Sequence, residues 1–285
     1  MCLSAPIRVL IWSLVAVALC VLLGVGLMIH EKRNHPQPPV EVTESEPEPS
    51  ESSQNSTIQP IFIETPSASF EGRDIRKVKI EWVSGSIQIY PGAMLSFDVK
   101  EPSDLDEEKK ATYEVSGDTL IIREYKQNWN FSLGFNLNQI NDYASKDLTL
   151  TVPAELSKLT IETVSSDVRI YDGLTMGELD IEAVSACVDC GSIAVDKLDI
   201  ETVSGDVELT LMNEAKNIDM ETVSGDLTLH VPEEMGFTAE TNSVSGDTNT
   251  DMTVTGSGKK MVHGDGKTRI QMDSVSGNLY IYKTR

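Results

Sequence analysis

Apolar and polar residues alternate over most of the chain beyond residue 75, and the alternation changes phase at recurring places. In the segment 198–211, LDIETVSGDVELTL, every second residue from Leu198 to Thr202 belongs to one face of an extended strand. From Val203 onward the alternation continues through Val207 but is shifted by one residue. A pleated strand cannot change phase without a bend or bulge. The pattern therefore predicts two short strands joined by a corner at the Val-Ser-Gly sequence.

The phase change recurs along the chain at nearly constant spacing. Its marker is the corner valine, found at Val83, Val164, Val184, Val203, Val223, Val244 and Val275. From Val164 to Val244 the intervals are 20, 19, 20 and 21 residues, and a fixed period in this range is typical of stacked arrays. We predict an all-β fold, a single-stranded β-solenoid (β-helix) with coils of about 20 residues. Separate antiparallel hairpins that turn at Ser-Gly are the alternative, although hairpins would not require a phase change in every unit.

A small residue follows each corner valine on the inward side of the expected strand. These residues are Gly85, Ser166, Ala186, Gly205, Gly225, Gly246 and Gly277. We expect the wall to turn at each of them, where no large side chain fits. Stacking the coils about 4.8 Å apart would bury the hydrophobic face of each unit and pair its backbone.

The first 60 residues differ in composition from the rest. A short tail, residues 1–8, precedes residues 9–29, which carry no charge and at about 1.5 Å per residue are long enough to cross a bilayer as one helix. A cleaved signal peptide is the alternative, but its apolar core is normally shorter and is followed by a small-residue cleavage site. Residues 30–60 are rich in Pro, Glu and Ser and predict a disordered stalk.

The orientation of the apolar segment depends on two opposing signals. Lys32 and Arg33 on one flank, against Arg8 on the other, favour a cytoplasmic C-terminal side. The short tail, the stalk and the acidic domain favour the opposite orientation. We predict a single-pass protein of the cell membrane whose domain is extracellular.

Residues 61–285 are predicted to form the solenoid domain, with an irregular part at 61–155 and regular repeats at 156–285. Within the irregular part, residues 113–122 predict a hairpin that turns at Gly117-Asp118. We expect the regular array to run in chain order to Val254 and the last unit, 270–282, to end it. Basic residues at the C-terminus would then discourage pairing of the final strand.

Residues 125–146 combine aromatic side chains with Gly and Asn and show no sustained alternation. Trp129, Phe131 and Phe135 are candidate binding residues if the segment is an exposed loop that contacts a ligand or a membrane. The same aromatic residues would be structural if the segment covers the open end of the solenoid.

The net charge of −22 changes the expectation for partners. Nucleic acids are recognised through basic patches, so the chain is not expected to bind them, whereas metal ions, basic peptides and basic polymers fit its charge. An acidic surface also serves solubility alone. Aligning the repeat units places Glu162, Glu182, Glu201 and Glu221 in one outward column, which is a candidate binding surface.

A second outward column consists of Asp167, Asp206, Asp226 and Asp247. Ca²⁺ could relieve the repulsion within such columns, yet no unit contains a known calcium-binding loop. The aspartates are therefore expected as turn residues on solvated faces. We predict no cofactor and no metal site.

Cys187 and Cys190 have the Cys-x-x-Cys spacing of redox and metal sites. In an extended strand, however, residues three apart point to opposite faces, where they can neither pair nor chelate. The four histidines form no recognisable catalytic motif, and the chain has no phosphate-binding loop. The sequence therefore predicts a protein that is not an enzyme.

The Glu-Thr-Val-Ser-Gly-Asp-Val repeats, the Gly-Asp-Thr-Leu-Ile-Ile hairpin and the Val-Ser-Gly-Asn-Leu segment at 275–279 resemble one bacterial family. It is the adhesin-like family of β-strand repeats, whose function is unknown, and the resemblance covers residues 75–282. The resemblance implies a β-helical fold, a cell-surface location and, in some members, a link to the cell-envelope stress response. It carries over no catalytic residue.

Together these features predict a non-enzymatic, membrane-anchored surface protein, an adhesin or an envelope-associated binding module. Its partners would be the membrane, through residues 9–29, and an extracellular protein, a polysaccharide or a cationic peptide. The alternative is a sensor or decoy in envelope stress that captures cationic peptides on its acidic faces. Salt-sensitive binding of such a peptide would favour the alternative, because exposed charges are screened by salt.

Overall fold

The computed structural model describes residues 62–70, 74–125 and 145–284. Most of them form β-strands, and one short 3-10 turn, η1, spans Glu107–Lys109. Within these ranges no helix is long and apolar enough to cross a bilayer. The predicted tail, membrane helix and stalk lie outside the described residues.

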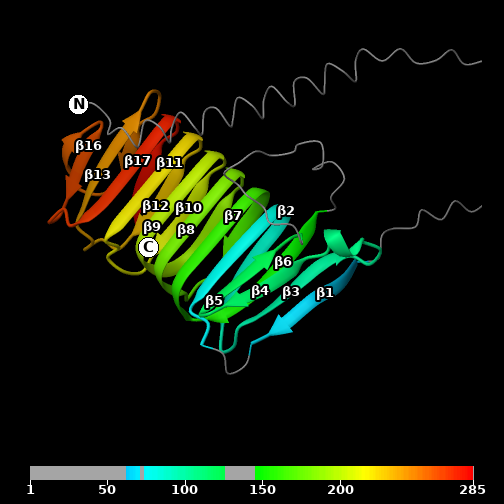
Figure 1. The fold of residues 1–285 in the computed structure, drawn as a ribbon. Coiled ribbons are helices and arrows are strands. Elements are labelled where there is room, and N and C mark those ends of the chain that lie inside the picture. Colours follow the sequence, from blue (N-terminus) through cyan, green and yellow to red (C-terminus); the bar gives the residue numbers. More distant parts are fainter. Residues whose placement is uncertain (1–61, 71–73, 126–144, 285) are drawn as a thin grey trace, which may run out of the picture.

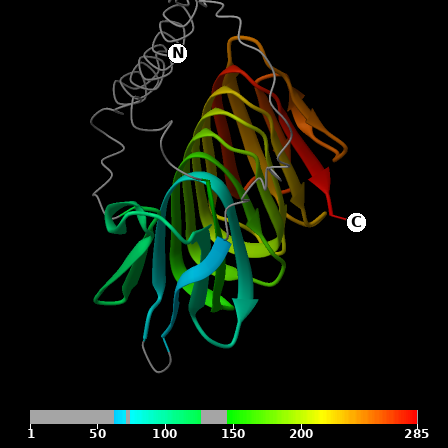
Figure 2. The same cartoon turned by 90° about the vertical axis from the view of Figure 1, so that its right-hand side faces the viewer.

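The strands wind as coils that turn at the Val-Ser-Gly corners, and seen end-on the coils form nested arches (Figures 1 and 2). Strand segments before a corner form the pre-corner sheet, segments after it form the post-corner sheet, and the hydrophobic core lies between the two sheets. In chain order the strands are β1 (Phe62–Ser69), β2 (Lys77–Gly92), β3 (Ser96–Pro102), β4 (Thr112–Ser116), β5 (Thr119–Arg123), β6 (Lys146–Pro153), β7 (Glu155–Ile170), β8 (Thr175–Ser185), β9 (Val188–Ser204), β10 (Val207–Leu211), β11 (Asn217–Ser224), β12 (Leu227–Val231), β13 (Phe237–Ser243), β14 (Thr248–Thr250), β15 (Thr255–Ser257), β16 (Lys260–His263), β17 (Thr268–Ser276) and β18 (Leu279–Lys283).

Equivalent residues of successive coils lie side by side in parallel register. Leu159 of β7 pairs with Leu179 of β8, Leu179 with Leu198 of β9, and Leu198 with Ile218 of β11. All four side chains are fully buried, so each coil covers the hydrophobic face of the next. The structure confirms an all-β, solenoid-like repeat, and the parallel register of these coils contradicts the alternative of separate hairpins.

Burial follows the predicted phase change, except at some of the corner valines. Ile200 and Thr202 are buried before the corner, and burial resumes at Val207 after it. The sequence pattern placed the valine on the inward side, but Val244 is 85% exposed and Val275 is 37% exposed. The expectation is confirmed at Val83, which is 3% exposed, and is wrong at Val244 and Val275, where the side chain lies outside the core.

Small corner residues allow the backbones of neighbouring coils to approach closely. Gly205 has a φ of +123°, and a Cβ atom there would overlap the carbonyl oxygen of Ala186 in the adjacent coil. The corner aspartates add hydrogen bonds between coils. The Asp206 carboxylate accepts one from the backbone N–H of Asp226 at 3.0 Å, and the Asp226 carboxylate accepts one from the N–H of Asn278 at 2.8 Å. Two of the predicted turn aspartates therefore stabilise the corners.

The last coil of the chain does not end the array. β17 pairs with β11 on one side and with β13 on the other, and β18 lies in the same way between β12 and β14. Figure 1 shows the red β17 between the yellow β11 and the orange β13. We expected the coils to stack in chain order and the final strand to be unpaired on one side, and this was wrong. The corners of all coils are so similar that the local sequence of a coil does not specify which other coil lies beside it.

The N-terminal end shows a related exchange of order. β2 pairs with β7 on one side and with β5 and β6 on the other, so the first coil in the sequence is internal in space. The predicted hairpin is confirmed, since β4 and β5 are antiparallel and Ser116 pairs with Thr119 across the Gly117-Asp118 turn. β3 pairs antiparallel with β6, and β1 with β3.

Candidate functional site

A column of carboxylates runs along the outer surface of the pre-corner sheet. Register pairs Glu81 with Glu162, Glu162 with Glu182, Glu182 with Glu201, Glu201 with Glu221, and Glu221 with Asp273. The predicted column is therefore present, and it extends by one residue at each end. Asp180, Asp199 and Asp219 form a parallel column two residues earlier in the strands. We call the two columns together the acidic face.

The central carboxyl groups of the acidic face have strongly perturbed acidities. Burial raises the pKa of Glu182, Glu201 and Glu221 to about 7 in each case, and neighbouring carboxylates add to the shift. For Glu201 the charged neighbours are Glu221, Asp199 and Asp180. Carboxyl groups about 4.8 Å apart on adjacent strands repel one another when ionised, and partial burial weakens the screening by water. The centre of the column thus holds a concentrated negative potential.

The ends of the column are better compensated than its centre. Lys79 lies 3.1 Å from Glu81 and 2.7 Å from Glu162, and Arg123 lies 2.8 Å from Glu81. At the other end, the carboxylate of the buried Asp273 accepts a hydrogen bond from the side-chain amide of Asn242 at 2.9 Å.

The aspartate column of the middle coils is also paired, Asp180 with Lys158 at 3.1 Å, Asp199 with Lys197 at 3.3 Å and Asp219 with Arg269 at 3.3 Å. Apart from Asp273, the carboxyl groups of the acidic face that have no ion pair within the described part of the chain are therefore those at the middle of the glutamate column. Among the residues that the structure describes, no group of three or more His, Cys, Asp or Glu side chains is arranged to hold a metal ion.

A second cluster of charged residues is buried inside the N-terminal coils. The ammonium group of Lys146 lies 3.1 Å from the Glu101 carboxylate and donates a hydrogen bond to the carbonyl oxygen of Glu124 at 2.7 Å. The Glu101 carboxylate also accepts a hydrogen bond from the backbone N–H of Ala111 at 3.0 Å. All three charged side chains are almost fully buried. Burial lowers the pKa of Lys146, while Glu101 and Glu124 oppose that shift.

Glu124 completes this buried cluster at the first Val-Ser-Gly corner. Its carboxylate accepts hydrogen bonds from the backbone N–H groups of Val83 and Ser84, and from the Tyr125 hydroxyl at 2.7 Å. Burial raises the pKa of Glu124 to about 7 in spite of these donors. The Lys146 ammonium also lies 4.4 Å from the centre of the Tyr125 ring. The cluster ties strands β3, β5 and β6 to the corner of β2.

Our reading of the sequence missed this cluster, although the alternation pattern contains it. Glu101 follows Phe97 and Val99 in the inward phase, and Lys146 precedes Leu148 in the same phase. A charged residue in an inward position of a strand is rarely buried without a partner. Two such positions of opposite sign would have predicted a buried ion pair.

The aromatic residues and the cysteines were the other candidates from the sequence. Trp129, Phe131 and Phe135 lie outside the described residues. Cys187 is exposed and Cys190 is buried, and both are free thiols, as the opposite-face prediction requires. Burial raises the pKa of Cys190 to about 12, which keeps this thiol protonated.

Comparison with protein families identifies the repeat. The family Toastrack DUF4097 matches the chain over residues 75–213 and again over residues 142–282. The chain belongs to this family. As a Toastrack DUF4097 protein it carries the family's repeat over nearly all of its described coils, and the two matches overlap over residues 142–213. The family resemblance predicted from the Val-Ser-Gly repeats is thereby confirmed.

Several solved structures align with this chain at low sequence identity. A candidate cell adhesion protein from Clostridium sporogenes is 14% identical, with a TM-score of 0.49, and the alignment covers 79% of this chain and 100% of that one. A candidate adhesin from Bacteroides fragilis is 15% identical, with a TM-score of 0.45 and coverage of 78% and 97%. A candidate lipid-binding protein from Parabacteroides distasonis is 13% identical, with a TM-score of 0.28 and coverage of 77% and 96%. The comparison with curated proteins gives no match.

Proposed function

We propose that this chain is a non-enzymatic, adhesin-like binding module of the cell surface that captures an extended cationic partner on its acidic face. The observation that carries the proposal is the in-register column of Glu162, Glu182, Glu201 and Glu221. The same side chain recurs on coil after coil, which suits a ligand that lies along the array rather than a substrate that reacts at one point. Burial is the main cause of the raised pKa values of Glu182, Glu201 and Glu221, and the repulsion from neighbouring carboxylates that adds to them supports a cationic partner.

A cationic partner would gain from the column in two ways. Its charges would relieve the repulsion between stacked carboxylates, and they would restore ionisation of groups that titrate near neutral pH. A basic peptide meets these needs through several lysine or arginine side chains at once. The role of a sensor or decoy for cationic peptides in envelope stress uses the same face and is the second candidate function.

Membrane anchoring is part of the same proposal. Residues 9–29 would span the membrane, residues 30–60 would hold the head away from it, and the head would face the outside of the cell. Protease treatment of intact cells should then release the head, and a head that stays protected would contradict this orientation.

The test of the proposed function uses the full chain in detergent and a ten-residue polylysine peptide as the probe. Binding should weaken steeply as salt is raised, because exposed charges are screened within about 10 Å at 0.1 M salt. The triple variant Glu182→Gln/Glu201→Gln/Glu221→Gln should weaken binding strongly. The matched control Glu108→Gln/Glu155→Gln/Glu214→Gln removes the same charge at exposed positions outside the acidic face. Equal losses in both variants would contradict a specific role of the column.

A further inference from the structure

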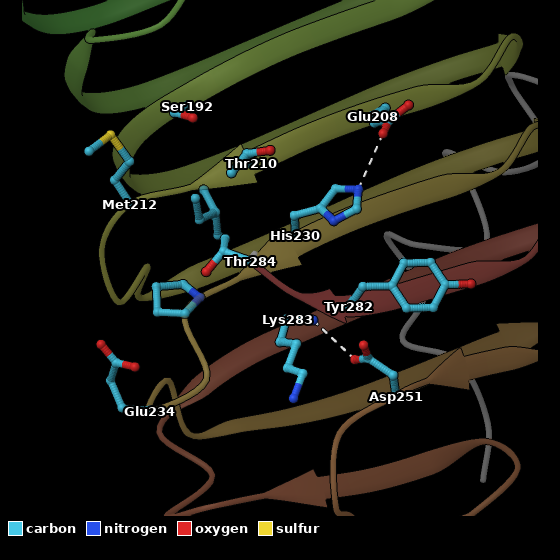
Figure 3. A pocket seen from close by; sticks show the side chains of 12 residues that line it. Ser192, Glu208, Thr210, Met212, His230, Glu234, Asp251, Tyr282, Lys283 and Thr284 are labelled. Carbon is cyan, nitrogen blue, oxygen red and sulfur yellow. Dashed lines mark hydrogen bonds and ion pairs between the residues drawn. The ribbon is translucent and has the colours of Figure 1, made fainter.

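A groove of about 1040 Å³ lies on the outer surface of the post-corner sheet, on the other wall of the array from the acidic face. Its floor is a row of outward side chains on four neighbouring strands, Ser192, Thr210, His230 and Tyr282. Figure 3 shows these side chains beside one another on the ribbon. The register between β9 and β10 shifts next to Ser192, and such bulges often lie beside functional sites.

The groove combines aromatic surface with hydrogen-bonding groups. The rings of Tyr282 and His230 have centroids 5.9 Å apart, and Tyr280 extends the aromatic surface at 6.1 Å from Tyr282. Met212, which is 62% exposed, adds apolar surface at the rim, as does Pro232. Aromatic side chains offer a flat apolar face together with a polar edge, which fits a partner that is itself both apolar and polar.

The polar groups of the groove are mainly acceptors. The carboxylates of Glu208, Glu234 and Asp251 line it together with the hydroxyl groups of Ser192 and Thr210, and they outnumber the one lysine, Lys283, whose backbone N–H donates to Asp251 at 3.0 Å. Figure 3 shows Glu208 directed toward His230, whose Nε2 atom lies 3.2 Å from the carboxylate. Carboxylates accept hydrogen bonds from vicinal hydroxyl groups, while a row of them repels anionic ligands.

We propose that this groove binds a linear β-1,4-linked oligosaccharide of neutral or amino sugars. The apolar face of a pyranose ring would stack on Tyr282, and its hydroxyl or amino groups would donate to Glu208, Glu234 and Asp251. The inference rests on the proposed role as a binding module but uses a different surface from the acidic face.

The spacing of the floor residues favours a sugar chain over a peptide. Neighbouring strands lie about 4.8 Å apart, so the four floor residues repeat at that distance along the array. This repeat is close to the length of one pyranose unit in an extended β-1,4-linked chain, so a chain along the array presents one unit to each strand. In an extended peptide, side chains on one face recur only about every 6.8 Å, twice the rise of about 3.4 Å per residue. Stacking of rigid rings on the groove floor requires matched spacing, whereas the long, flexible lysine side chains of a peptide on the acidic face can reach carboxylates that repeat about every 4.8 Å.

The experiment titrates the full chain in detergent with three tetrasaccharides and follows binding by ligand-observed NMR and calorimetry. The probes are β-1,4-linked tetra-N-acetylglucosamine, its fully deacetylated form and tetragalacturonate. The first two share the linkage and differ in charge, while tetragalacturonate is anionic and α-1,4-linked and so mismatches the groove in both respects. The test variants are Tyr282→Ala and Thr210→Arg. The arginine side chain of the second variant would occupy the groove floor while the Tyr282 ring is kept. The matched control is Tyr171→Ala, since Tyr171, directly after β7, stacks on Tyr90 of β2 with centroids 4.0 Å apart, and neither residue lines the groove.

The neutral and amino probes should bind, and tetragalacturonate should bind at least about tenfold more weakly. Both test variants should weaken binding about tenfold, which is the loss expected for about 1.4 kcal/mol, while Tyr171→Ala leaves it unchanged. The proposal is overturned if none of the three probes binds, if tetragalacturonate binds best, or if Tyr282→Ala and Thr210→Arg bind as the original chain does. Polylysine binding to the acidic face in the same samples separates failure of this inference from failure of the proposed function.

Discussion

The ammonium group of Lys146 lies 3.1 Å from a carboxylate oxygen of Glu101, and at most 1% of either side chain is exposed. Strands β3 and β6 bring the two residues together, and the pair is enclosed by the first coils. Removing one member of a buried pair leaves the other as an uncompensated charge away from water, which is strongly unfavourable.

Replacement of Lys146 with Met should therefore lower the free energy of unfolding by about 3–5 kcal/mol. Chemical denaturation of the full chain, followed by the circular dichroism of its strands, would measure the change. Lys216→Met is the matched control, because Lys216 forms a 2.7 Å ion pair with Asp196 in which both partners are exposed. Such exposed pairs contribute about 0–1 kcal/mol. A similar small loss in both variants would show that Lys146 has no special role.

The raised pKa values predict that the fold is more stable in mild acid than at alkaline pH. The pKa values of Glu124, Glu182, Glu201 and Glu221 rise from 4.5 to about 7 in the folded chain. Between these values the folded state binds more protons than the unfolded state, so the stabilisation is complete below pH 4.5 and is lost as pH rises through about 7. Denaturation midpoints at pH 5 should exceed those at pH 8.

The glutamine variant of the acidic face tests the source of this pH dependence. Glu182→Gln/Glu201→Gln/Glu221→Gln should flatten the profile and raise stability at pH 8, by roughly 1 kcal/mol per group once solvent screening is allowed for. The control variant at Glu108, Glu155 and Glu214 should keep the slope. An unchanged slope in the first variant would contradict the assignment of the titration to the column.

Close approach of backbones at a corner makes Gly205 sensitive to substitution. Gly205→Ala places a Cβ atom on a residue with positive φ, which is strained, and this atom would also overlap the carbonyl oxygen of Ala186. We therefore expect the free energy of unfolding to fall by more than about 2 kcal/mol. Gly258→Ala is the control, because Gly258 also has a positive φ, of +67°, but no atom lies within 4 Å of the added Cβ. It should lose only about 1 kcal/mol. Thermal unfolding of both variants measures the difference, and equal losses would mean that the overlap is absent.

The exchanged order of the last coils can be tested by engineered disulfides in a chain whose exposed Cys187 is replaced with Ser. Gln271 pairs with Asp219 on one side and with Glu240 on the other. Cysteine pairs at 219/271 and at 240/271 should therefore both oxidise. A pair at 219/240 should not, because those strands lie two spacings of about 4.8 Å apart, beyond the reach of a disulfide. Oxidation of the 219/240 pair, detected by mass spectrometry, would show that the coils stack in chain order.

Local pattern was enough to predict the repeating unit. The phase change at Val-Ser-Gly, the small corner residues and the column from Glu162 to Glu221 depend only on strand parity and period, so they follow from the residues of each unit. The hairpin turn at Gly117-Asp118 was likewise predictable, because a two-residue turn is a local feature.

Tertiary structure alone decided which coils are neighbours and which of the inward charged residues contact one another. β17 pairs with both β11 and β13. Every coil offers a similar backbone edge, so the sequence of β17 does not specify which coils will be its neighbours. That choice depends on how all the coils pack together. The contacts of Lys146 with Glu101 and Glu124 join residues far apart in the chain, as does the row from Ser192 to Tyr282 along the groove floor. Such contacts arise from the closing of the array, and no single repeat unit contains the information that specifies them.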